Sequence, residues 1–73
     1  MMPLFMADAG EENIIRRVGG SPEMKNHLED MGITRGVEIY VCKLAPLGDP
    51  IEVNVRGYEL SLRKADAEMI EVE

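Results

Sequence analysis

Residues 46–63 read Pro46-Leu47-Gly48-Asp49-Pro50-Ile51-Glu52-Val53-Asn54-Val55-Arg56-Gly57-Tyr58-Glu59-Leu60-Ser61-Leu62-Arg63, and the fold prediction starts from this segment. Apolar and polar residues alternate on both sides of Arg56-Gly57, and the glycine permits the positive φ of a tight hairpin turn. A two-residue turn predicts three apolar pairs on one face: Val55 with Tyr58, Val53 with Leu60, and Ile51 with Leu62. A shift of one residue would exchange the two faces, so the pattern predicts the register as well as the strands.

The chemistry of the turn leaves one alternative open. Arginine is not an ideal first residue for a type I′ turn, so a bulged or three-residue turn at Arg56-Gly57 would also suit the sequence. Either version places Glu52, Asn54, Glu59 and Ser61 on the polar face of the hairpin.

One helix is predicted at about residues 21–31. Ser21 can accept hydrogen bonds from the free N–H groups of the first turn, and Pro22 suits the first helical position. Apolar residues recur at helical spacing along one side, namely Met24, Leu28 and Met31. Gly32 is expected to end the helix in the left-handed conformation, with Ile33 touching Leu28.

The remaining pattern predicts a mostly β protein. Three further strands are expected at residues 12–18, 37–43 and 69–72, with a short helical turn at about 64–68, and the apolar residues of the lead-in 1–9 should close one end of the core. Five short strands favour a small SH3-like five-stranded barrel, closed or nearly closed, as a single domain over residues 1–73. An OB-like barrel is the other candidate, but its nucleic-acid face needs basic and aromatic residues that this chain offers sparingly.

The composition of the chain restricts its partners. The 73 residues contain 8 Lys and Arg against 14 Asp and Glu, a net charge of −6, and no basic stripe that could follow phosphates, so nucleic acid is a poor partner. No apolar run approaches the ~20 residues that cross a bilayer, so no membrane insertion is expected. Cys42 is the only cysteine and cannot form an internal disulfide, which is compatible with the cytoplasm.

The residues that could carry chemistry are few. His27 is the only histidine and lies on the polar side of the predicted helix, and Cys42 has no nearby Cys or His partner. Arg16 and Arg17 could hold an anion, but two arginines on a short strand more often form a solvated edge against carboxylates. The sequence therefore predicts no enzyme, with no catalytic residue, metal site or cofactor.

An ordered set of residues over most of the chain resembles the FeoA family, the small ferrous iron transport protein A of bacteria. The residues that carry the resemblance are Gly19-Gly20, Leu28, Asp30-Met31-Gly32-Ile33, Gly36, 46–51, 55–64, Ala67 and Ile70. The resemblance implies an SH3-like barrel and a cytoplasmic accessory role beside the membrane transporter FeoB, whose cytoplasmic part binds GTP. A related SH3-like domain ends the iron-dependent repressors of the DtxR type.

The leading hypothesis is a protein-binding module that docks on the cytoplasmic part of FeoB. Loops on a rigid scaffold are where recognition residues concentrate, and the 43–50 loop carries two leucines that would be either tucked over a barrel mouth or exposed. The predicted contact surface contains Tyr40, Leu44, Pro46, Leu47, Asp49, Pro50 and Tyr58.

The second hypothesis is a regulator that senses Fe²⁺ directly. Carboxylate oxygens suit that ion, although no spacing in the sequence gathers them. The candidate ligands are Asp30, Asp49, Glu52 and Asp66.

Overall fold

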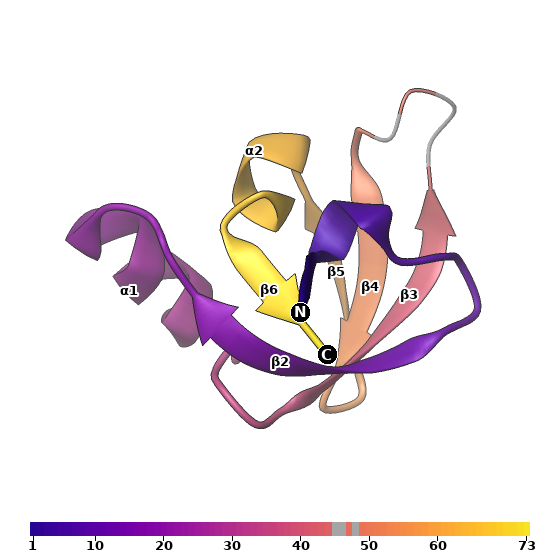
Figure 1. Ribbon diagram of the computed structural model, residues 1–73, viewed down its shortest axis with the longest axis horizontal. Helices are drawn as coiled ribbons and strands as arrows, with labels where there is room; N and C mark the ends of the chain where they lie inside the picture. The colour runs from indigo at the N-terminus through magenta and orange to yellow at the C-terminus, as the bar shows by residue number, and fades with distance from the viewer. Residues whose placement is uncertain (45–46, 48) are drawn as a thin grey trace.

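The hairpin has the predicted register. A computed structural model of the chain describes residues 1–44, 47 and 49–73 (Figure 1). Strand β4 (Ile51–Val55) pairs with β5 (Tyr58–Leu62), and its residue pairs include Ile51 with Leu62 and Val55 with Tyr58. Both turn residues have positive φ, 54° at Arg56 and 85° at Gly57, which is the two-residue type I′ geometry. No bulge is needed, and arginine occupies a left-handed position that it seldom adopts.

Helix α1 (Pro22–Asp30) begins and ends as the sequence predicts. The Ser21 hydroxyl accepts a hydrogen bond from the Met24 N–H at 3.2 Å. At the other end, Ile33 N–H donates to Leu28 C=O at 3.0 Å, and Gly32 N–H donates to the carbonyl of Glu29 at 2.9 Å. These two bonds form a Schellman motif around Gly32, whose φ is 90°.

The sheet has six strands in the order β1-β6-β2-β3-β4-β5, one more than predicted. The added strand is β1 (Met2–Pro3), which pairs with β6 (Ile70–Val72) because the chain start lies along it. The other two strands are β2 (Glu12–Val18) and β3 (Glu38–Leu44). Since β1 and β5 stand at opposite ends of this order, the sheet is open rather than closed.

Two short helical segments lie beside the strands. The 3₁₀ turn η1 (Leu4–Met6) follows β1, and α2 (Lys64–Ala67) connects β5 to β6. Figure 1 shows η1 and α2 at the same end of the molecule as the Leu44 end of β3. Leu4 is fully buried, so the lead-in closes one end of the core as expected.

The core is entirely apolar among the described residues. Its buried side chains are Leu4, Ala7, Ile15, Leu28, Ile33, Ile39, Val41, Ile51, Val53, Val55, Leu62, Ala67, Ile70 and Val72. Charges stay at the surface, where Arg16 pairs with Glu73 at 2.6 Å beside the β2–β6 pairing. The carboxylate partner that the sequence favours for Arg16 is therefore present, but β2 is not an edge strand, because it pairs with both β6 and β3.

Val53→Ala should destabilise the domain. Val53 is fully buried and lies between Val41 and Leu60 in the sheet, so its truncation removes buried methyl groups and leaves a cavity. We expect the free energy of unfolding to fall by about 2–4 kcal/mol in urea denaturation. Glu52→Ala, on the exposed face of the same strand, is the matched control and should change it by less than about 0.5 kcal/mol.

Gly32→Ala should destabilise the domain through the backbone alone. A Cβ atom at Gly32 would meet neighbouring atoms only at 3.9 Å or beyond, so there is no steric clash, but the φ of 90° disfavours alanine. We expect a loss of about 1 kcal/mol in thermal denaturation. Gly32→Asn should lose less, because asparagine tolerates this region; equal losses for the two variants would contradict the explanation.

Candidate functional site

The two leucines of the β3–β4 connection have different environments. Leu44 is half-buried, lies opposite Ile51 and packs against the core. Leu47 is 89% exposed. Of the two alternatives that the sequence left open, Leu44 therefore follows the packed one and Leu47 the exposed one. Pro46, which belongs to the predicted contact surface, lies outside the described residues.

Asp49 ties this connection to α2. One carboxylate oxygen of Asp49 accepts a hydrogen bond from the backbone N–H of Lys64 at 3.2 Å. Lys64 is the first residue of α2, where N–H groups lack partners within the helix, so Asp49 caps that end from fifteen residues away. Asp49 is thus a structural residue as well as an exposed one, and Pro50 beside it is exposed.

Two residues of η1 lie at the same end of the molecule as the β3–β4 connection. The Lys64 ammonium lies 5.8 Å from the centre of the Phe5 ring, within the range of a cation–π contact. Met6 is 63% exposed although it follows the buried Leu4 by only two positions. We call Phe5, Met6, Leu44, Leu47, Asp49 and Pro50 the loop-end surface. Sequence reasoning missed Met6 as a surface residue because it assigned all the apolar residues of the lead-in to the core, against which Phe5 does pack.

The two tyrosines of the predicted contact surface lie elsewhere. Tyr58 pairs with Val55 beside the hairpin turn and is 73% exposed to solvent. Tyr40 lies opposite Asn54 and is 39% exposed. The loop-end surface begins at the other end of the same strands, where Leu44 meets Ile51. Four residues of extended strand span roughly 13 Å, so the structure does not bring the tyrosines together with the loop.

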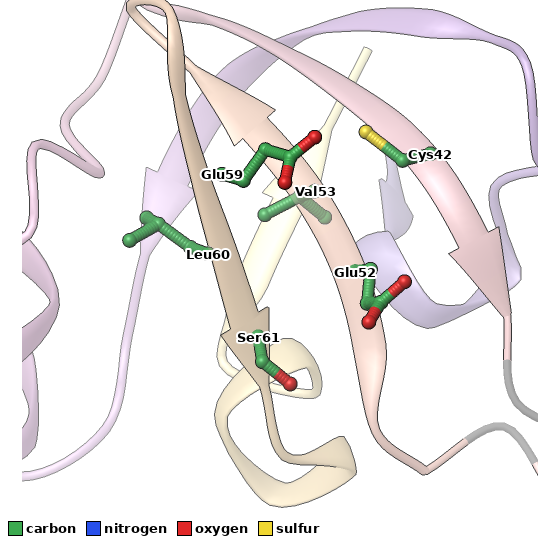
Figure 2. Close-up of a pocket in the computed structure, with 6 residues that line it drawn as sticks. All are labelled: Cys42, Glu52, Val53, Glu59, Leu60 and Ser61. Carbon is green, nitrogen blue, oxygen red and sulfur yellow. The ribbon is translucent and has the colours of Figure 1, made fainter.

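A shallow depression of about 250 Å³ lies on the outer face of β3, β4 and β5. Figure 2 shows Cys42, Glu52 and Glu59 standing on this face, one from each strand, with Leu60 directed away from them. Ser61 completes its polar lining, and no histidine is among the lining residues. The Cys42 thiol lies 3.9 Å from the carbonyl oxygen of Tyr40, to which it can donate a hydrogen bond. The depression therefore places one thiol beside two carboxylates and a hydroxyl.

Metal ligands do not cluster in the part of the chain that the structure describes. No three His, Cys, Asp or Glu side chains there lie close enough to hold an ion. His27 is exposed on α1. Nor does any helix in the described ranges have the length and apolar character to cross a membrane.

Comparison with known sequences decides the family. The sequence model of the FeoA domain matches residues 2–73, nearly the whole chain. The chain belongs to the FeoA domain family. It is 38% identical over 72 residues to a Fe(2+) transport protein A/Fe(2+) transporter FeoB fusion protein of Porphyromonas gingivalis. The match covers 99% of this chain but only 8% of that relative, so this FeoA domain corresponds to a small part of the fusion protein.

Solved FeoA structures have the same fold. The FeoA protein of Chlorobium tepidum is 40% identical, with a TM-score of 0.89, over 99% of this chain and 69% of that one. The FeoA of Stenotrophomonas maltophilia, described as an SH3 domain protein and solved in complex with zinc, is 19% identical with a TM-score of 0.82 over 100% of this chain and 91% of that one. The SH3-like, mostly β fold class that the sequence predicts is thereby confirmed, with an open sheet.

Asp49→Ala should lower the stability of this FeoA domain more than Asp49→Asn does. Asparagine keeps a side-chain oxygen that can accept the Lys64 N–H, and alanine removes it. We expect a loss of about 1 kcal/mol for Asp49→Ala in thermal denaturation and less than half of that for Asp49→Asn. Equal stability of both variants and the parent would show that the hydrogen bond contributes nothing.

Proposed function

We propose that this FeoA domain is an accessory, non-catalytic module of ferrous iron transport that docks in the cytoplasm on the GTP-binding part of the transporter FeoB. Membership of the family associates the chain with ferrous iron transport. The observation that carries the finer proposal is the relative in which transport protein A and FeoB form one chain. Fusion holds two modules at high effective concentration, which is useful when they act on each other.

The loop-end surface suits such docking. Leu47 and Met6 expose large apolar side chains to solvent. The segment of Met6 is anchored by the buried Leu4, and the segment of Leu47 by the Asp49–Lys64 hydrogen bond. An exposed apolar side chain gains by burial against a partner, and anchored loops lose little conformational entropy on binding. Within the loop-end surface, Leu47 is the best candidate for an anchor residue because it is the most exposed.

The tyrosines are a separate part of the proposal. Tyr40 and Tyr58 remain partner-binding candidates, but a partner that covers the loop-end surface would need to extend along the strands to reach them. Tyr58→Ala therefore tests this part separately: a raised Kd would indicate that the partner extends along β5 to the exposed ring beside the hairpin turn.

Direct iron sensing is supported less well. Asp49 accepts the Lys64 N–H, and Asp66 accepts the Arg63 N–H at 3.3 Å, so both carboxylates are engaged at the start of α2. Glu52 lies on the outer face of β4, and Asp30 ends α1. Within the described residues these four side chains form no ligand cluster, so a docking role explains the structure better.

Leu47→Ala should weaken docking without unfolding the domain. The side chain is 89% exposed, so the folded state loses little when it is truncated, while a partner loses an apolar contact. We expect the Kd for the purified cytoplasmic part of the cognate FeoB to rise about tenfold, or ~1.4 kcal/mol, in calorimetry with GTP, with GDP and without nucleotide.

The control for this measurement is Asn26→Ala on the exposed surface of α1, which should change that Kd by less than about twofold while circular dichroism shows both variants folded. Unchanged binding by Leu47→Ala would remove the loop-end surface from the proposal. The absence of binding by the parent domain in every nucleotide state would overturn the docking function itself.

A further inference from the structure

Half of the basic residues of this acidic chain line one groove. Arg16, Arg17, Lys25 and Arg35 border a depression of about 470 Å³ between the end of β2 and α1, together with a single acid, Glu29. The chain has 8 basic residues and a net charge of −6. The groove therefore carries 4 − 1 = +3, and the rest of the molecule carries −6 − 3 = −9. The residues that line the groove therefore have a net positive charge, whereas the rest of the domain has a net negative charge.

The fold brings these cations together from three segments. Gly36 N–H donates to the carbonyl of Ile15 at 2.7 Å, and Ile15 N–H donates to the carbonyl of Val37 at 2.9 Å. These bonds hold the turn that carries Arg35 against the middle of β2, next to Arg16 and Arg17. The chain between β2 and α1 then leads directly to Lys25 on the helix. The convergence is a product of tertiary structure, since Arg17 and Arg35 are far apart in the sequence.

Three of the four cations have no carboxylate partner among the described residues. Arg16 contacts Glu73 at 2.6 Å, which is the one ion pair that the described ranges contain. Glu29 follows Lys25 by four positions on α1, but their charged groups are not within 4.0 Å. Arg17 stands opposite Glu71 in the β2–β6 pairing without an ion pair within 4.0 Å, so the charges of Lys25 and Arg35 are the least compensated around this concavity.

We propose that this groove binds a short acidic segment of a partner protein, rich in Asp or Glu. Guanidinium groups present paired N–H donors that match carboxylates, and two arginines with a lysine around one depression can hold two or three of them. The groove is distinct from the loop-end surface: in Figure 1, α1 lies at the left and the Leu44 end of β3 at the right. The domain then has two docking surfaces, and the acidic segment needs only the groove.

Charge over the whole domain favours a short peptide over a longer polyanion. A nucleic acid or an anionic bilayer extends well beyond a groove of this size and would meet the surface that carries the remaining −9. Like charges across such a contact oppose binding, whereas a peptide of a few residues meets only the cations. A free inorganic anion would satisfy one arginine but not cations from three segments.

The test uses a fluorescein-labelled oligoglutamate peptide as the probe and the full chain as the receptor. We expect fluorescence anisotropy to show binding that weakens with added salt, and NMR shifts of the backbone amides of Arg17, Lys25 and Arg35. Arg17→Gln/Arg35→Gln should raise the Kd about tenfold. Glu29→Gln should lower it about threefold, because it removes the one acid in the groove.

The matched control is Lys43→Gln/Arg56→Gln, which removes the same charge from outside the groove and should raise the Kd less than about twofold. Oligoglutamine should not bind. The proposal is overturned if the two double variants weaken binding equally, if the shifts map elsewhere, or if single-stranded DNA, phosphatidylserine vesicles or inorganic phosphate occupy the groove more tightly than the peptide. None of these results bears on docking to FeoB through the loop-end surface.

Discussion

The register of β4 against β3 and β5 controls which side chains enter the core. Ile51, Val53 and Val55 are all essentially fully buried, and β4 is the only strand of the hairpin that pairs on both sides, with β3 and with β5. A shift of one residue would bring Glu52 into an apolar core, at a desolvation cost comparable to the whole stability of a small domain. The same register sets the position of every exposed residue on β3 and β5.

Because the core of the described residues is entirely apolar, the charged and polar side chains lie at or near the surface. The described residues include no buried charged or polar residue, and the depression on the outer face places a thiol beside two carboxylates. The surface also presents exposed apolar side chains at the loop end and a basic groove beside α1. In the Porphyromonas gingivalis relative, transport protein A and FeoB form one chain.

Several features could be predicted because they depend on neighbours in the sequence. The hairpin pairs follow from period-two alternation around a two-residue turn, and both ends of α1 follow from Ser21 and from Gly32 with Ile33. The short strand β1 escaped prediction, since two residues carry no periodic signal and β1 forms only where β6 offers a free edge. The exposure of Met6 escaped for a related reason, because the sequence pattern of an apolar lead-in is the same whether a given side chain is buried or exposed.

Local spacing of apolar, glycine and capping residues is therefore enough to predict every strand except β1, the register of the β4–β5 hairpin, the limits of the helix and the family. The tertiary structure was needed to show that Leu44 packs while Leu47 is exposed, that the tyrosines lie away from the loop, and that Arg17 and Arg35 share a groove. Those outcomes depend on hydrogen bonds between distant segments, such as Gly36 to Ile15 and Lys64 to Asp49. A pattern of neighbouring residues carries no information about which distant segment will be its partner.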